Sequence, residues 1–487
     1  MAYLDTNAFN FILGFLSSQF SPICSLITLP EQSMEQRTIQ GIRIGKPGTQ
    51  TKRTVLLFGG CHARELVNPD LLLQFAFKLM TAFNTNTDLV FGSVVYATST
   101  VQLIVQSIDV IIVPLINPDG RAYVQSTDPW WRKNRNPNGG ATCAGVDINR
   151  NYDFLWSSGI GTSTNLCSET YKGTAPFSEP ETRNVRSLLD TYPEIEAMVD
   201  VHSYSELVLY PWGDDETQTT DPNMNFMNPA FNGQRGTGGD VYKEYMKPDD
   251  EAFFEDVGFR VRDAIHAVRG RCYTVKTGFG LYPTSGTSKD YAYSRHIVDS
   301  SKRKIFAYTF ETGQEFQPPA AEASQIMTEV GAGLFEFCLA ICCPILSKKQ
   351  HQPYCSVAPS TIDLFHSPLV TKTRMGKRYE SLLTTHFMEV RELMETNQSI
   401  YRAVVRLIRS TDQVARLHFA DSPGTIDERL IQNIERALSN LSRAKGIGVE
   451  IKETMDSVRK DLPHFKGKTF VEGLKSADRE ELKRKKP

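Results

Sequence analysis

The sequence predicts a large α/β domain with a mainly parallel sheet, followed by a smaller all-helical module. Within the first 348 residues, helical patterns alternate with four apolar, β-branched segments: 54–58, 109–116, 196–201 and 304–310. Such alternation favours a parallel sheet. After residue 348 the chain becomes charged and helical with no further strand pattern. We therefore expect a main domain in residues 1–348, a linker in 349–374 and a coiled-coil-like helical module in 375–487.

Composition excludes several classes of protein. The 487 residues are 40% hydrophobic and 23% charged, with a formal net charge of -2, which is typical of globular proteins and argues against a nucleic-acid partner. The most apolar run, residues 331–346, is interrupted by Glu336 and indicates a buried helix end, so no membrane span is expected. No signal peptide is visible, because no Lys or Arg precedes Arg37.

Each of the four predicted strands ends in a polar or glycine-rich cluster. The clusters are Gly59-Gly60, Asn117-Pro-Asp-Gly120, His202 and Glu311. Ligand crevices in open α/β sheets lie beyond the carboxyl ends of the strands, so these clusters are expected to converge. Between them, residues 178–181 (Ser-Glu-Pro-Glu) indicate a capping box that begins a helix through Leu189. Residues 214–248, rich in Asn, Gly, Pro and Asp, indicate an inserted loop at the rim of a cleft.

The C-terminal module shows two helical patterns. A four-three spacing predicts a coiled-coil stripe formed by Leu383, Phe387, Val390, Met394, Tyr401, Val404 and Ile408. A second capping box at residues 425–428 precedes an apolar stripe of Ile431, Ile434, Leu438, Leu441, Ile451, Met455, Val458 and Leu462. We expect a helical hairpin or an oligomerising arm, with self-association or a helical partner through residues 375–465.

Three residues at strand ends have the chemistry of a catalytic metal site. His62 and Glu65 form a His-x-x-Glu string just after Gly60, which alone could equally be a solvated loop with an Arg64-Glu65 pair. His202 alone could be a core histidine. Together they make a set of two imidazoles and one carboxylate, which leaves a zinc coordination position open for water.

The residues resemble the zinc carboxypeptidases of the carboxypeptidase A/B type, in order, over residues 3–348. The shared strings are His62-Ala-Arg-Glu65, Asn117-Pro-Asp-Gly120, Trp131-Arg-Lys-Asn-Arg135, Gly145-Val-Asp-Ile-Asn-Arg-Asn151, Cys167-Ser-Glu-Thr-Tyr-Lys-Gly173, His202-Ser-Tyr-Ser205, Tyr282-Pro-Thr-Ser-Gly286 and Phe310-Glu311. The resemblance implies a mixed, largely parallel twisted sheet with helices on both faces, and an enzyme that hydrolyses the C-terminal bond of peptides or proteins.

The resemblance also implies the roles of individual residues. One Zn²⁺ would be held by His62, Glu65 and His202, with Asp147 orienting the first histidine. Glu311 would be the general base toward a metal-activated water. Arg135 would face the scissile carbonyl and stabilise the developing oxyanion. The groups that match the binding site for the substrate's free carboxylate are Asn149, Arg150 and Tyr282. The groups that would extend the upstream subsites are Arg64 and Tyr204.

Lys289 matches the position at the floor of the family's pocket for the C-terminal side chain. A buried ammonium needs a counter-charge, so the residue predicts a preference for C-terminal Glu or Asp. The competing interpretation is an ordinary lysine that extends out of the pocket to solvent.

Cys143 and Cys167 match a disulfide pair of the secreted enzymes, which favours a secreted, extracellular or otherwise oxidising location. With no signal peptide visible, a cytoplasmic form with free thiols is the alternative. Two function classes remain: a zinc exopeptidase, and a catalytically weak peptide-binding or scaffold protein in which the helical module is the selected part. Retention of all three ligands with Glu311 and Arg135 favours the enzyme.

Overall fold

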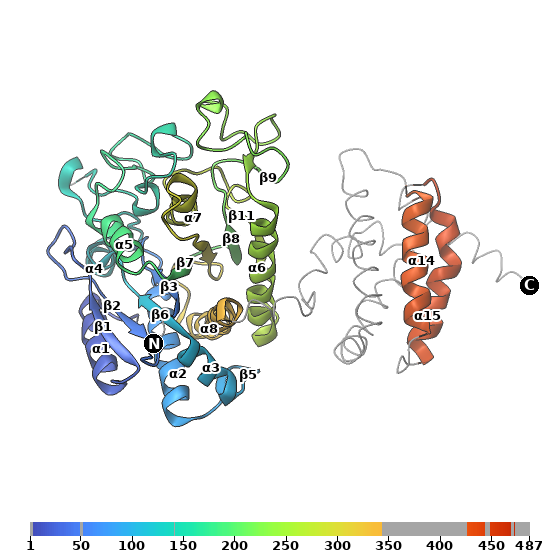
Figure 1. Ribbon diagram of the computed structural model, residues 1–487, viewed down its shortest axis with the longest axis horizontal. Helices are drawn as coiled ribbons and strands as arrows, with labels where there is room; N and C mark the ends of the chain where they lie inside the picture. The colour runs from blue at the N-terminus through green and yellow to red at the C-terminus, as the bar shows by residue number, and fades with distance from the viewer. Residues whose placement is uncertain are drawn as a thin grey trace, which may run out of the picture. The chain divides into compact units, whose positions relative to one another are not determined.

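A computed structural model describes residues 3–48, 52–140, 142–342, 426–443, 449–468 and 472 (Figure 1). The chain divides into two compact units, Met1–Gln352 and Pro353–Pro487. The linker predicted at 349–374 and the coiled-coil stripe predicted from Leu383 to Ile408 lie outside the described residues.

The first unit is built on an eight-stranded mixed sheet. Its order is β1 (Cys24–Thr28), β2 (Gln40–Ile44), β6 (Ile108–Val113), β3 (Arg53–Gly59), β7 (Ile195–His202), β12 (Phe306–Glu311), β8 (Leu207–Tyr210) and β11 (Thr274–Thr277). The four strands predicted from the sequence are the adjacent parallel set β6, β3, β7 and β12. β2 joins β6, and β8 joins β12, in antiparallel pairing. The predicted α/β fold with a largely parallel sheet is confirmed.

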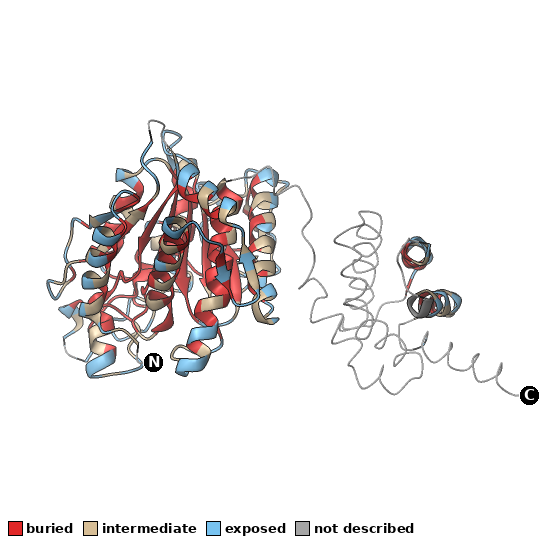
Figure 2. Cartoon of the chain, turned by 90° about the horizontal axis from the view of Figure 1, so that it is seen from below, coloured by how far each residue is buried: buried red, intermediate tan, exposed pale blue. Residues whose placement is uncertain are grey.

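Helices cover both faces of this sheet. The main helices are α1 (Thr6–Gln19), α2 (Val67–Thr85), α3 (Thr98–Ser107), α4 (Pro118–Ser126), α5 (Pro180–Thr191), α6 (Pro248–Arg269), α7 (Ser288–Val298) and α8 (Ala320–Cys342). One face of the strands packs against α1, α2, α3, α6 and α8 in a single buried cluster. The other face packs against α5 and α7. Side chains of the central strands β6, β3, β7 and β12 alternate between these two cores, so most of them are buried, whereas the edge strands β1 and β11 are largely exposed or half-buried (Figure 2).

Helix α8 is long and apolar enough to cross a membrane by composition, but 72% of its most apolar window is buried inside the unit. Its packing against α6 and α2 accounts for the apolar sequence, as expected for the described part of that run, residues 331–342.

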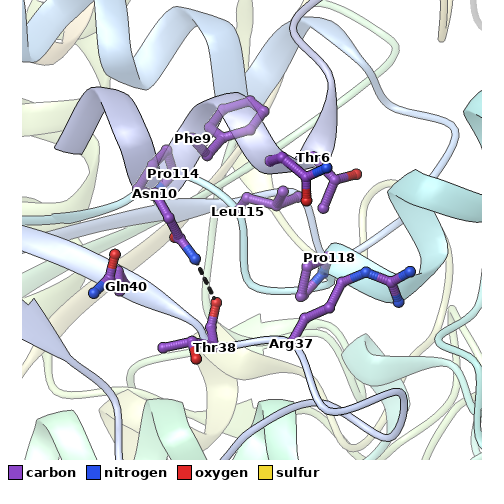
Figure 3. A pocket seen from close by; sticks show the side chains of 10 residues that line it. Thr6, Phe9, Asn10, Arg37, Thr38, Gln40, Pro114, Leu115 and Pro118 are labelled. Atoms are coloured by element: carbon purple, nitrogen blue, oxygen red, sulfur yellow. Dashed lines mark hydrogen bonds between the residues drawn. The ribbon is translucent and has the colours of Figure 1, made fainter. Parts of the chain in front are cut away.

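The loop at residues 214–248 contains two short paired strands, β9 (Thr217–Gln218) and β10 (Glu244–Tyr245), and one 3-10 turn. Another small sheet pairs β4 (Leu89–Phe91) with β5 (Val94–Tyr96). Away from these, a pocket of about 250 Å³ lies between α1 and the segments that precede β2 and follow β6. In this pocket the Asn10 amide donates to the Thr38 carbonyl, which fastens α1 to the sheet (Figure 3).

The described part of the second unit is a helical hairpin of α14 (Glu428–Ser442) and α15 (Val449–Asp461). Its buried face carries Ile431, Ile434, Leu438 and Leu441 from α14 and Met455, Val458 and Leu462 from the second half. The predicted capping box is displaced, because the cap of α14 is Asp427, whose carboxylate accepts from the Leu430 amide at 2.7 Å.

The predicted capping box at residues 178–181 does not form either. The cap of α5 is Glu179, without a side-chain capping bond, because the Ser178 hydroxyl donates to the Glu179 carboxylate at 2.7 Å. The carboxylates of Glu179 and Glu181 instead accept from Asn134, at 2.7 and 3.0 Å. Both acids are fully buried. They hold the loop that carries residues 131–136 against α5.

We expect Glu181→Gln to flatten the pH dependence of stability. Burial and the charge of Glu179 raise the pKa of Glu181 to about 8. Between the usual carboxyl pKa and this value, the folded chain keeps a proton that the unfolded chain releases. The wild type should therefore lose stability as pH rises through this window, by roughly 1.4 kcal/mol per pH unit.

Urea unfolding of the full chain at pH 5, 6, 7 and 8 measures the effect. Glutamine cannot ionise and can still accept from Asn134. The free energy of unfolding of the variant should therefore rise relative to that of the wild type as pH increases. The matched control is Glu169→Gln at an exposed carboxylate. Parallel profiles for the wild type and Glu181→Gln would contradict the prediction.

Candidate metal and active site

The site lies where β3, β7 and β12 end. β7 ends at His202 and β12 ends at Glu311, and the pairing of these two strands places the two residues side by side. β3 ends at Gly59, and Gly60 then turns the chain with a φ of +70° toward His62. A side chain at Gly60 would meet Leu115 and Pro69 within 3.0 Å. This position therefore requires glycine.

The structure brings His62, Glu65 and His202 together. One potential ligand atom from each lies within 4.8 Å of the others. His62 Nδ1 is 2.7 Å from Glu65 Oε1 and 3.0 Å from His202 Nδ1, and His202 Nδ1 is 3.3 Å from Glu65 Oε2. Two imidazole nitrogens that face each other at this distance need a proton or a cation between them. The donor set therefore fits a small divalent ion.

Carboxylates lie behind both imidazoles. His62 Nε2 is 3.1 Å from Asp147, and His202 Nε2 is 2.9 Å from Asp200. A ring N–H that donates to each carboxylate leaves the opposite nitrogen of the ring free to bind a metal. Asp147 is where the sequence predicted it. Asp200 was missed, although its position two residues before His202 places both side chains on one face of a strand.

The charges of the cluster set the protonation of its acids. Burial favours a raised pKa for Glu65, but His62 and His202 hold it well below its usual range. Asp147 is likewise buried, and Arg132, Arg150 and His62 hold its pKa well below its usual range. Both acids are therefore carboxylates when the protein is folded at neutral pH.

The pKa of Glu311 shifts in the opposite direction to those of Glu65 and Asp147. Burial and the charge of Glu65 raise its pKa to about 8, while His202 and Arg132 oppose the rise. A carboxyl group with a pKa close to neutrality can exchange a proton during a reaction.

The structure corrects the expectation for Arg135. Its guanidinium stacks 3.7 Å from the centre of the Tyr123 ring and lies 3.8 Å from Glu35, so it contacts these two side chains and not the metal cluster. Arg132 in the same string donates to Asp147 at 2.9 Å, and its charge acts on Glu65 and Glu311. When two arginines lie three residues apart in one irregular loop, spacing alone does not say which of them reaches the cluster; the path of the backbone decides it. The position beside the cluster of His62, Glu65 and His202 belongs to Arg132.

The residues expected to bind the substrate carboxylate lie next to this cluster. The Asn149 carbonyl accepts from Arg150 at 2.7 Å, and the Asn149 side chain accepts from the Ser288 amide at 2.9 Å. The Arg150 guanidinium lies 5.9 Å from the ring of Tyr282, which is 47% exposed. Arg64 and Tyr204 meet at Phe316, with ring distances of 4.4 and 4.8 Å. Asn149 and Arg150 are thus fixed, whereas Tyr204 and Tyr282 face solvent.

Comparison with known proteins agrees with this geometry. The family model described as zinc carboxypeptidase matches residues 12–332. Carboxypeptidase A4 of Mus musculus is 28% identical over 338 residues, covering 68% of this chain and 69% of the relative. Carboxypeptidase B of Astacus astacus is 30% identical over 313 residues, covering 64% of this chain and 86% of the relative.

The chain belongs to the zinc carboxypeptidase family. It is a peptide hydrolase of the metallocarboxypeptidase class. Two solved structures share the fold at low identity. Bovine thrombin-activatable fibrinolysis inhibitor, in complex with tick carboxypeptidase inhibitor, matches with a TM-score of 0.54 at 23% identity, covering 69% of this chain and 96% of that one. Carboxypeptidase A of Helicoverpa armigera matches with a TM-score of 0.55 at 24% identity, covering 71% and 75%.

In this carboxypeptidase, Lys289 is buried in the first turn of α7, with 3% exposure. The interpretation of Lys289 as a solvent-directed lysine is wrong. Its ammonium contacts both oxygens of Asp290, at 2.8 and 2.9 Å. Gly213 and Gly278 lie against the ammonium, and a Cβ on either would come within 3.1 and 2.5 Å of Nζ. Both glycines therefore pack closely against this charge, where a larger side chain would displace it.

The predicted disulfide between Cys143 and Cys167 is present. It closes a loop that contains Asp147, Asn149 and Arg150, and it is consistent with an oxidising compartment. The carboxypeptidase therefore carries Asp147, which contacts His62, and the neighbouring Asn149 and Arg150 within one covalently closed loop.

The placement of the two arginines gives a direct test. Arg132→Lys should lower kcat for a C-terminal peptide substrate by about 100-fold or more, since a lysine cannot keep the paired contact with Asp147 while facing the reaction. Arg135→Lys is the matched control and should change kcat by less than about threefold. Steady-state kinetics on the zinc-loaded full chain measure both. A larger loss for Arg135→Lys would reverse the assignment.

Proposed function

We propose that this chain binds one zinc ion through His62, Glu65 and His202 and removes single C-terminal residues from peptides or proteins. The convergence of these three ligands beside Glu311 carries the proposal. A bound zinc ion supplies Lewis-acid chemistry, polarising the scissile carbonyl and making water more acidic.

Glu311 is the proposed general base. It lies across the strand pair from His202, so a water molecule at the open side of the cluster comes within its reach. The carboxylate takes a proton from this water and passes it to the leaving amine. Arg132 neutralises the charge that develops on the carbonyl oxygen.

The residues next to the metal cluster explain why the enzyme would cleave only at the C-terminal end of a peptide. Asn149 and Arg150 offer an amide and a planar guanidinium to the free carboxylate of the substrate. Tyr282 is exposed at the rim and stacks loosely on Arg150, so it can close over a bound end. An internal peptide bond has no carboxylate to satisfy these groups.

Lys289 supports a preference for acidic C-terminal residues. Its ammonium is buried and pairs with Asp290, which leaves one N–H without a carboxylate partner in this pair. A substrate Glu or Asp side chain that reaches the ammonium can accept from that N–H. A substrate Lys or Arg would bring a second buried cation, which is costly. We also propose a secreted or extracellular location, on the basis of the disulfide.

Glu311→Gln tests the mechanism. The variant should hold zinc at the wild-type stoichiometry yet lose turnover by several orders of magnitude, because glutamine cannot accept the proton. Zinc is measured by mass spectrometry and turnover by release of one C-terminal residue, with o-phenanthroline abolishing the wild-type activity. Turnover by Glu311→Gln near the wild-type rate would refute the assignment. A wild-type chain that binds zinc but releases no residue would favour the peptide-binding alternative.

Lys289→Met tests the substrate preference. On hippuryl-type substrates ending in Glu, Phe and Lys, the wild type should cleave the Glu substrate fastest. The variant should lose about 10- to 100-fold in kcat/KM for Glu relative to Phe, the loss expected for one charged hydrogen bond. Lys302→Met, at an exposed lysine, is the control. Fastest cleavage of the Phe substrate by the wild type would overturn the preference without affecting the assignment of Glu311.

A further inference from the structure

The carboxylate behind His202 is a feature that the proposed mechanism does not use. Asp200 lies on β7, has no exposed surface, and joins three segments of the chain. Its Oδ2 lies 2.9 Å from His202 Nε2 and accepts from the Ser288 hydroxyl at 2.6 Å. Its Oδ1 lies 3.5 Å from the sulfur of Cys61. Strand β7, the first turn of α7 and the loop after β3 therefore meet at this one side chain.

A buried carboxylate is costly unless donors surround it. Here each oxygen has a donor within the chain, and the strongest available one is a ring N–H of His202. With the proton on Nε2, the lone pair of Nδ1 faces Glu65 and His62, where the ligand atoms converge. The contact with Asp200 thus selects the tautomer of His202 that can bind a metal.

We propose that Asp200 is a positioning residue that fixes the orientation and tautomer of His202 and ties it, through Ser288, to the turn of α7 that carries Lys289. The inference rests on the metal site of the proposed function. It assigns His202 a carboxylate partner of its own, as Asp147 is for His62.

One competing arrangement uses the same atoms. The ligand atoms of Cys61, Asp200 and His202 also lie within 4.8 Å of one another, so these residues could hold a second cation with His202 as a bridge. The hydrogen bonds favour the positioning role, because Ser288 and His202 both direct donors at Asp200 and satisfy its charge without a cation. Zinc stoichiometry separates the two arrangements.

Asp200→Asn is the decisive variant, studied in the full chain at one pH. Asparagine keeps the size and one acceptor but loses the charge. We expect the zinc dissociation constant, measured by competition with a chromogenic chelator, to rise about 10- to 100-fold, with one zinc per chain at saturation in both proteins. The melting temperature of the zinc-free protein should change far less than that of the zinc-loaded protein, a difference that a purely structural role would not produce.

Two further variants keep the test decisive. Ser288→Ala removes one donor to Asp200 without altering the ligands, and it should weaken zinc binding by a smaller factor of about two to ten. It gives the answer if Asp200→Asn does not fold. Asp109→Asn is the matched control, a buried carboxylate on β6 whose partners are Arg43 and Lys52, and it should leave zinc affinity unchanged.

Unchanged zinc affinity in Asp200→Asn, or in Ser288→Ala if the first variant fails to fold, would overturn the inference. Two zinc ions per wild-type chain, reduced to one in Asp200→Asn, would overturn it in favour of the bridged site. Failure of the wild type to bind zinc would refute the proposed function as well, so the two failures can be told apart.

Discussion

The register of three parallel strands is the constraint on which the site depends. β3, β7 and β12 are neighbours that end at the same edge of the sheet, and the pairing of β7 with β12 sets Glu311 directly beside His202. A shift of one residue in either strand would turn these side chains to the opposite face. The register is held by strand side chains packed into two apolar cores, so the rigidity of the site derives from burial on both faces of the sheet.

The charged side chains around the cluster of His62, Glu65 and His202 form a network of buried pairs. Asp147 contacts both His62 and Arg132, so one carboxylate orients an imidazole of the cluster and the neighbouring guanidinium. Glu179 and Glu181 hold the segment carrying that arginine through Asn134. Removal of a partner from such a network leaves a buried charge unsatisfied, which costs more than the bond itself is worth.

The sequence predicted the features that repeat along the chain or belong to short strings. Periodic apolar patterns identified the four parallel strands, and His-x-x-Glu with a distant histidine identified the cluster. The choice between Arg132 and Arg135 depended on the direction of an irregular loop, which neither spacing nor composition determines. Asp200 was missed because a single acidic residue inside an apolar strand pattern does not by itself indicate a functional role. Both capping boxes failed because a competing acid, Glu179 or Asp427, occupied the cap position.

The bond between Cys143 and Cys167 has a consequence for where this chain can work well. It shortens the path available to the segment that carries Asp147, Asn149 and Arg150. In a reducing environment the contacts of Asp147 with Arg132 and of Asn149 with Ser288 would still hold the folded segment. The unfolded chain, however, would gain conformational entropy, so the folded domain would lose stability. Redox conditions outside the protein are in this way linked to the stability of the loop that carries these three residues.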